Sequence, residues 1–218
     1  MPSPPPSTPA PRGAWTDLLK ALAQRESGNR PGAVNRYGYL GLYQMGEAAL
    51  IDAGFYTRDG TSKNDWIGSW TATARRLRVT SKPTFLASRA AQTEAVTRFW
   101  QAQWRYIVHF DLDDWVGRTV GSIRLTASGL LGGAHLVGVG GLRRWLQSAA
   151  GGGSTDGNGV SARTYVALFN DYQTPFSARR DRSSMMASLL ESRPLTGAAT
   201  ATPAAGEPAT RALLATPT

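Results

Sequence analysis

Apolar residues recur at helical spacing near the start of the chain. Four of them share one face of a predicted helix with an acid, at positions i, i+3, i+4, i+7 and i+11: Trp15, Leu18, Leu19, Leu22 and Glu26. Gly28, Pro31 and Gly32 follow, and these residues break helices. The pattern therefore predicts a helix that ends just after Glu26 and turns this acid toward the core.

The same periodicity predicts further helices, and strand patterns are scarce. The predicted segments are 46–51, a helix that begins at Thr84 or Ser88, a helix from Val120 into the glycine-rich run 132–141, 160–172, and 185–190. In the second of these, five residues share one face: Val96, Phe99, Trp100, Gln103 and Ile107. Residues 52–70 are predicted to form a loop. We therefore expect a mainly α fold.

Composition divides the chain into one domain and two tails. The chain has 218 residues and 41% hydrophobic content, which is enough for one domain with a packed core. Residues 1–13 are rich in Pro, and residues 192–218 are rich in Ala, Thr and Pro and lack aromatic side chains. We expect a disordered arm at 1–13, a single folded domain at 14–191 and a disordered tail at 192–218.

Charge and the absence of cysteine narrow the classes of function. The net charge of +9 indicates an anionic partner, such as nucleic acid, a membrane surface or bacterial cell wall. The arginines are scattered and form no nucleic-acid motif, so no nucleic-acid partner is expected. With no Cys and only His109 and His135, neither a metal site nor a cofactor is predicted. No secretory signal and no segment of transmembrane length is expected.

Glu26 is the first candidate for acid chemistry. A carboxyl on an apolar face is costly to ionise, and an acid that keeps its proton near neutral pH is suited to general acid catalysis. The alternative is that Glu26 reaches solvent from a frayed helix end. Glu47 is the rival acid, although a helix N-terminus favours its charge without any catalytic role.

The residues around Glu26 resemble the opening of the lysozyme-like lytic transglycosylase domain. That family has a catalytic Glu followed by Ser, then Gly-Leu-Met-Gln after a fixed gap. Here Glu26-Ser27 and Gly41-Leu42-Tyr43-Gln44-Met45 stand at that spacing, with Tyr43 where Met is usual. The resemblance covers roughly residues 15–172 and implies a mainly α, single-domain lysozyme-like fold.

The third motif of the family, Ala-Tyr-Asn-x-Gly, is only partly present. Ala134 and Gly138 match it, but His135 and Leu136 replace Tyr and Asn. In the family that Tyr points toward the catalytic Glu. The resemblance implies the same position for His135. The alternative is a His whose hydrogen bonds are satisfied by backbone at a helix–turn junction.

The resemblance implies an enzyme that cleaves the β-1,4 bond between N-acetylmuramic acid and N-acetylglucosamine in peptidoglycan. Glu26 would be its acid and base, and the substrate-binding residues would be Ser27, Tyr43, Gln44, Met45 and His135. A transglycosylase then forms a 1,6-anhydro sugar without a second carboxylate. A hydrolytic lysozyme needs one, and the acids of second rank are Glu47, Asp52, Asp59 and Asp65.

Two hypotheses from other classes of function stay open. The missing Tyr-Asn pair fits a non-catalytic peptidoglycan-binding module, and charge alone fits a nucleic-acid binder. For the enzyme, we expect synthesis in a bacterial cytoplasm without a signal peptide. Action would follow in the periplasm or cell wall of a target cell, after delivery by a secretion machine or as a phage lytic protein. An antibacterial effector of this kind implies a cognate immunity protein.

Overall fold

The described residues form one mainly helical domain. The computed structural model describes residues 10–148, 155 and 159–176. Its helices are α1 (Trp15–Ser27), α2 (Glu47–Asp52), α3 (Ala72–Arg76), α4 (Lys82–Ala87), α5 (Arg89–His109), α6 (Ala127–Gln147) and α7 (Ala162–Phe169). A short 3₁₀ helix, η1 (Leu112–Trp115), precedes an antiparallel hairpin of β1 (Thr119–Val120) and β2 (Ile123–Arg124). The prediction of a mainly α single domain is confirmed.

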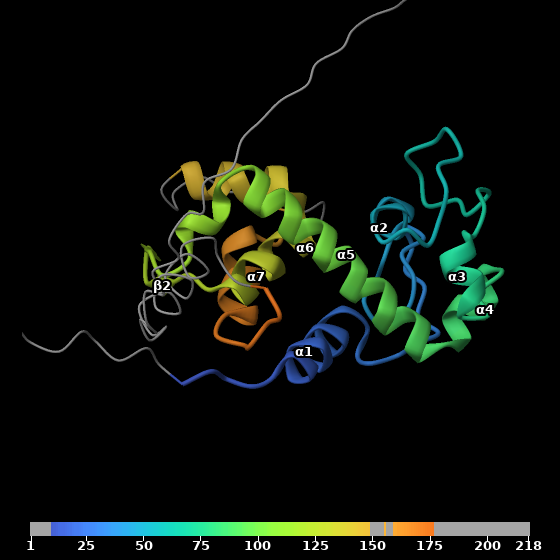
Figure 1. The fold of residues 1–218 in the computed structure, drawn as a ribbon, viewed down its shortest axis with the longest axis horizontal. Helices are drawn as coiled ribbons and strands as arrows, with labels where there is room; N and C mark the ends of the chain where they lie inside the picture. The colour runs from blue at the N-terminus through green and yellow to red at the C-terminus, as the bar shows by residue number, and fades with distance from the viewer. Residues whose placement is uncertain (1–9, 149–154, 156–158, 177–218) are drawn as a thin grey trace, which may run out of the picture.

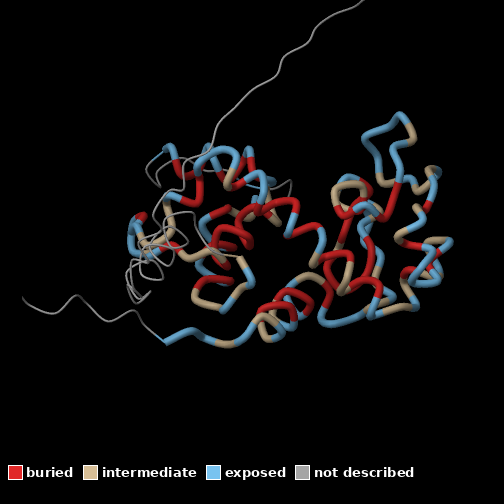
Figure 2. The backbone as a smooth tube through the Cα atoms, viewed as in Figure 1, coloured by how far each residue is buried: buried red, intermediate tan, exposed pale blue. Residues whose placement is uncertain are grey.

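Helix α5 links the two ends of the molecule. Figure 1 shows it running diagonally, with α2, α3 and α4 at one end and α6, α7 and the hairpin at the other. Its predicted apolar face is buried: Val96, Phe99, Trp100, Gln103 and Ile107. Figure 2 shows buried residues along α5 and on the surfaces that face it. One core cluster therefore extends from α1 to α7.

Helix α1 ends as predicted. Gly28 caps it in the left-handed conformation (φ 63°), and its N–H bonds back to the carbonyl of Gln24. Helix α5 begins after Ser88, whose side chain accepts a hydrogen bond from the N–H of Ala91. Ser88 is thus the correct one of the two predicted start points, and Thr84 lies inside the short helix α4.

The helix predicted from Val120 is wrong in its first turn. Val120 and Ile123 pair across the hairpin, which turns at Gly121 (φ 60°). A three-residue spacing of apolar side chains fits a tight hairpin as well as a helix. Helix α6 begins only at Ala127, where the Thr126 side chain accepts a hydrogen bond from the N–H of Gly129.

The other differences concern helix length. Helix α7 ends at Phe169 rather than at residue 172, because the Asn170 side chain bonds back to Thr126 and to the carbonyl of Arg124. The predicted helix at 185–190 and most of both predicted tails lie outside the described residues. Gly13, at the end of the predicted arm, forms a parallel bridge with Tyr172, so it is part of the packed structure.

Glycines on α6 allow α7 to pack against its backbone. A Cβ on Gly132 would lie 2.7 Å from a ring carbon of Phe169, and one on Gly133 would lie 2.7 Å from a methyl of Val166. Both distances are shorter than van der Waals contact allows. The glycine-rich run is therefore helical and serves as a docking face for α7. Gly138, with φ 68° and ψ 168°, interrupts α6 three residues after His135.

Gln92 joins three separate segments in the core. Its Oε1 accepts a hydrogen bond from the N–H of Leu42 at 2.7 Å, and its Nε2 donates to the carbonyls of Pro31, Phe85 and Leu86. Gly41 has φ 75° and a Cβ there would lie 2.3 Å from Gln92 Oε1, so only glycine fits. The turn that carries Gly41 and Leu42 is thus fixed to α5 and α4.

No helix among the described residues is long and apolar enough to cross a membrane.

We predict that Gln92→Leu lowers the free energy of unfolding by about 2–4 kcal/mol. Leu fills a similar volume but leaves the buried N–H of Leu42 without an acceptor, and each such orphan costs about 1–3 kcal/mol. Urea denaturation followed by circular dichroism measures the change. Gln101→Ala, an exposed position on the same helix, should change stability by less than about 0.5 kcal/mol. Equal effects of the two substitutions would contradict the role of Gln92.

Candidate active site

A cavity of about 510 Å³ opens beside the end of α1. Its walls come from the last turn of α1, the loop before α2, the loop before α3 and the middle of α6. The lining residues are Glu26, Asn35, Tyr37, Tyr39, Gln44, Ser62, Lys63, Asn64, His135 and Leu136. Glu26 is the one acid among the described residues that line it.

Glu26 is held in place by a residue of α7, 139 positions further along the sequence. Its Oε1 accepts a hydrogen bond from the hydroxyl of Tyr165, on α7, at 2.7 Å. The Glu26 side chain is only 15% exposed, so it does not escape to solvent at the end of α1. Burial raises the pKa of Tyr165, and the charge of Glu26 raises it further. Tyr165 therefore keeps its proton and acts as a donor to the carboxylate.

His135 faces the same carboxylate from α6. Its Nε2 lies 3.9 Å from Glu26 Oε1, which is longer than a hydrogen bond but is a distance that can tighten on substrate binding. On the other side of the ring, Nδ1 accepts a hydrogen bond from the indole N–H of Trp100 at 3.2 Å. Because a nitrogen that accepts carries no proton, the proton of the neutral ring must be on Nε2. His135 therefore presents an N–H donor toward Glu26.

Two effects keep His135 neutral. Burial lowers the pKa of His135, against the opposing influence of the Glu26 charge and of the backbone carbonyl of Tyr43. A second proton would also have to go on Nδ1, where it would face the N–H of Trp100. The His135 ring thus contacts the side chains of Trp100 and Glu26 and also has the backbone carbonyl of Tyr43 as a partner, so features of both predictions for His135 are present.

Three of the residues expected to bind substrate support the site instead of lining it. Ser27 is buried, and its Oγ donates to the carbonyl of Leu42 at 3.0 Å, which ties the end of α1 to the Gly41–Leu42 turn. Tyr43 is buried with its hydroxyl 3.2 Å from Thr93, and Met45 is in the core. Gln44 and His135 do line the cavity.

The tyrosines and asparagines of the cavity are functional candidates that the sequence did not single out. Asn35 Oδ1 accepts hydrogen bonds from the N–H groups of Tyr37 and Tyr39. Asn64 Nδ2 donates to the carbonyl of Tyr37 at 3.0 Å, so the two walls are joined. Tyr37 is 51% exposed and Tyr39 is 39% exposed, which leaves ring surface free for a ligand. Asn35, Tyr37, Tyr39 and Asn64 belong to no recognised sequence motif. Their place in the cavity follows only from the fold.

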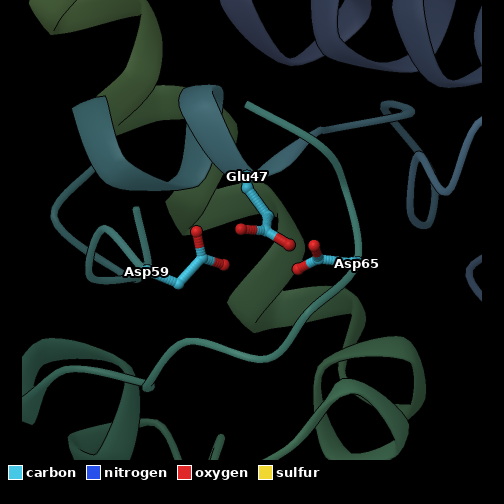
Figure 3. Close-up of side chains that lie close together, drawn as sticks. All are labelled: Glu47, Asp59 and Asp65. Carbon is cyan, nitrogen blue, oxygen red and sulfur yellow. The ribbon is translucent and has the colours of Figure 1, made fainter. Parts of the chain in front are cut away.

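The acids of second rank lie apart from this cavity. Glu47 and Asp52 line a neighbouring cavity of about 360 Å³, and Ser62 and Lys63 line both cavities. Figure 3 shows the carboxylates of Glu47, Asp59 and Asp65 turned toward one another. These three are the side chains in the described part of the chain whose oxygens are grouped closely enough to hold a metal ion.

Comparison of the chain with protein-family models, with curated protein sequences and with solved structures found no match.

We predict that in Trp100→Phe the neutral His135 ring is no longer restricted to the tautomer with its proton on Nε2. Without the indole N–H, the proton of the neutral ring can move to Nδ1, and the pKa of His135 should rise because a proton on Nδ1 no longer meets another donor. Nitrogen chemical shifts of the imidazole across a pH series measure both effects. The resonances of His109, at the end of α5, should not respond to the substitution. An unchanged His135 spectrum would contradict the assignment of the Nε2 proton.

Proposed function

We propose that this chain is a peptidoglycan-cleaving muramidase, a lytic transglycosylase with Glu26 as its general acid and base. The observation that carries the proposal is the setting of Glu26. Among the described residues it is the one acid lining a cavity of about 510 Å³, and two neutral donors, Tyr165 and His135, are directed at it. This cavity volume is in the usual range for small-molecule sites, roughly 300–1,000 Å³. The lysozyme-like fold belongs to the same proposal.

The reaction uses one carboxyl group twice. Protonated Glu26 gives its proton to the glycosidic oxygen, the bond from C1 of the muramic acid to that oxygen breaks, and N-acetylglucosamine leaves with a free 4-hydroxyl. Glu26, now a carboxylate, takes the proton from the C6 hydroxyl of the muramic acid. The C6 oxygen bonds to C1 and forms the 1,6-anhydro ring. No water is consumed, and Glu26 regains its proton.

The hydrogen-bond donors Tyr165 and His135 stabilise the stage of this cycle at which Glu26 has given up its proton. After the first proton transfer Glu26 carries a negative charge, and donors already aimed at it need no reorganisation to stabilise that charge. A neutral His135 supplies this donor through its Nε2–H without placing a positive charge beside Glu26.

The lining of the cavity favours the anhydro product over hydrolysis. Hydrolytic glycosidases place a second carboxylate roughly 5–9.5 Å from the first. None of the second-rank acids Glu47, Asp52, Asp59 and Asp65 is among the described residues that line the Glu26 cavity. The alternative of a lysozyme would need one of them to enter it.

The remaining lining suits an amino-sugar polymer. Exposed rings of Tyr37 and Tyr39 offer surface for stacking on sugar rings, and Asn35, Gln44 and Asn64 carry amides that can bond hydroxyl and acetamido groups. Lys63 places a positive charge at the rim for the carboxylates of the peptide stems. We further propose, as the resemblance implies, that the enzyme acts on the wall of a target bacterium as an antibacterial effector. An immunity protein would then inhibit it by covering this cavity.

We predict that Glu26→Gln lowers the rate of peptidoglycan cleavage by roughly 100-fold or more, the usual contribution of a general acid. Purified peptidoglycan is digested with each protein and the products are weighed by mass spectrometry. Wild-type products lighter by one water than the hydrolytic products establish the anhydro route. Products with full-mass reducing ends mean a lysozyme.

Glu94→Gln is the matched control for this substitution. Glu94 is on the exposed side of α5, where it pairs with Arg98, so its loss should leave cleavage unchanged. If Glu26→Gln cleaves as fast as the wild type, Glu26 is not the acid, and Glu47→Gln is the next variant to assay. If the wild type binds peptidoglycan without cleaving it, the chain is a binding module.

We predict that Tyr165→Phe lowers kcat by about 10- to 100-fold with little change in KM. A hydrogen bond to a charged group contributes about 1.5–3 kcal/mol, and Tyr165 donates one to Glu26 Oε1. Tyr106→Phe, at an exposed tyrosine of α5, should change neither quantity. A fall in kcat that is matched by a loss of folding stability in urea denaturation would reduce Tyr165 to a packing role.

A further inference from the structure

Three acids far apart in sequence come together beside the second cavity. Glu47 is the first residue of α2, and Asp59 and Asp65 lie within the loop of residues 53–71 between α2 and α3. One carboxylate oxygen from each lies within 4.8 Å of the other two. Figure 3 shows the Glu47 carboxylate between those of Asp59 and Asp65. Glu47 is buried at 4% exposure, Asp59 is half-buried and Asp65 is exposed, so the cluster runs from the interior to the surface.

The negative charge of this cluster is not balanced by neighbouring side chains. No Lys or Arg in the described ranges forms an ion pair with Glu47, Asp59 or Asp65, although the chain has 24 Lys and Arg residues. Glu47 accepts a hydrogen bond from the N–H of Trp66. Among the described residues the cluster therefore has no basic side chain as a counter-charge.

A second observation at the same place points to a missing ligand. Three buried side-chain polar atoms of the described residues have no hydrogen-bond partner, and two of them are here: Tyr56 Oη and Asp59 Oδ2. Tyr56 is 2% exposed. Its ring packs edge-on against Trp66, the residue that follows Asp65 and whose backbone N–H donates to Glu47. Orphaned buried oxygens next to unbalanced carboxylates are what an absent ion and its water would satisfy.

We propose that Glu47, Asp59 and Asp65 hold a divalent cation of the calcium class. Two oxygens bound to one Ca²⁺ at roughly 2.4 Å lie at most about 4.8 Å apart, and one oxygen from each of these three carboxylates lies within that limit of the other two. An all-oxygen set of three carboxylates suits Ca²⁺ better than Mg²⁺, which keeps most of its waters and uses one or two carboxylates, and better than zinc, which prefers nitrogen and sulfur. A water on the cation would reach the Tyr56 hydroxyl.

The cation would fix the loop that separates the two cavities. Ser62, Lys63 and Asn64 lie between Asp59 and Asp65 in sequence, and they line the Glu26 cavity. Asn64 Oδ1 also accepts the N–H of Glu47 at 2.8 Å, so the loop and α2 are already joined at one point. Cation ligation by Asp59 and Asp65, on either side of residues 62–64, would fix this part of the loop and hold Lys63 at the rim of the cavity. This tie does not depend on the proposed chemistry at Glu26, so its test uses binding.

The experiment is calorimetric titration of the chelator-treated full chain with CaCl₂, and in parallel with MgCl₂. We expect one saturable Ca²⁺ site with Kd below about 1 mM and weaker binding of Mg²⁺. Asp65→Asn and Asp59→Asn should each weaken Ca²⁺ binding by about ten-fold or more, since both keep an oxygen but lose a charge. Asp114→Asn, which removes an exposed acid elsewhere, is the matched control and should bind as the wild type does.

Trypsin provides a second measurement at the loop itself. Cleavage after Lys63, followed by mass spectrometry, should slow several-fold on addition of Ca²⁺ in the wild type and in Asp114→Asn, but not in Asp65→Asn. Folded wild-type protein that gives no saturable Ca²⁺ signal overturns the site, and a proton shared between Glu47 and Asp59 then balances the charge. Undiminished binding by both Asp59→Asn and Asp65→Asn overturns it equally.

Discussion

The close approach of α6 and α7 is the constraint on which the rest of the site depends. It is possible because glycines at 132 and 133 leave no side chain between the two helices. With α7 seated on that face, Tyr165 reaches Glu26 across 139 positions of sequence. His135 comes from the same stretch of α6 and reaches the same carboxylate. A larger residue in place of either glycine would separate the acid from its donors without touching any of them.

The first half of the chain supplies the opposite wall by a different kind of bond. Ser27 and Gln92 fix the turn after α1 through hydrogen bonds between their side chains and the backbone of Leu42, and Gly41 leaves room for Gln92. This wall is therefore held by hydrogen bonds, whereas the α6–α7 side is held by packing. The motif that resembles a transglycosylase therefore marks two sorts of position. Glu26 and Gln44 face the cavity, whereas Ser27, Tyr43 and Met45 maintain the backbone that presents them.

Local periodicity was enough to predict the helix that carries Glu26 and the buried face of α5, because each depends on neighbours within a few turns. It was misleading at Val120 and Ile123, where the same spacing belongs to a hairpin. Tyr165 was visible only as one residue of an apolar helical face, because its bond to Glu26 depends on how α7 docks. The grouping of Glu47, Asp59 and Asp65 has no sequence signature, since their spacing matches no metal-binding loop and results from how one loop folds back on α2.

The pairing of Gly13 with Tyr172 has a consequence for how the domain joins other polypeptide. Arg12 and Gln173 also bond across this junction, so the chain enters and leaves the described fold at adjacent points. A domain with neighbouring ends can be carried inside a loop of a larger protein, or closed into a ring and reopened elsewhere, with little strain on its own core. The fold is therefore suited to insertion into another protein, because both of its ends can join the host chain at a single site.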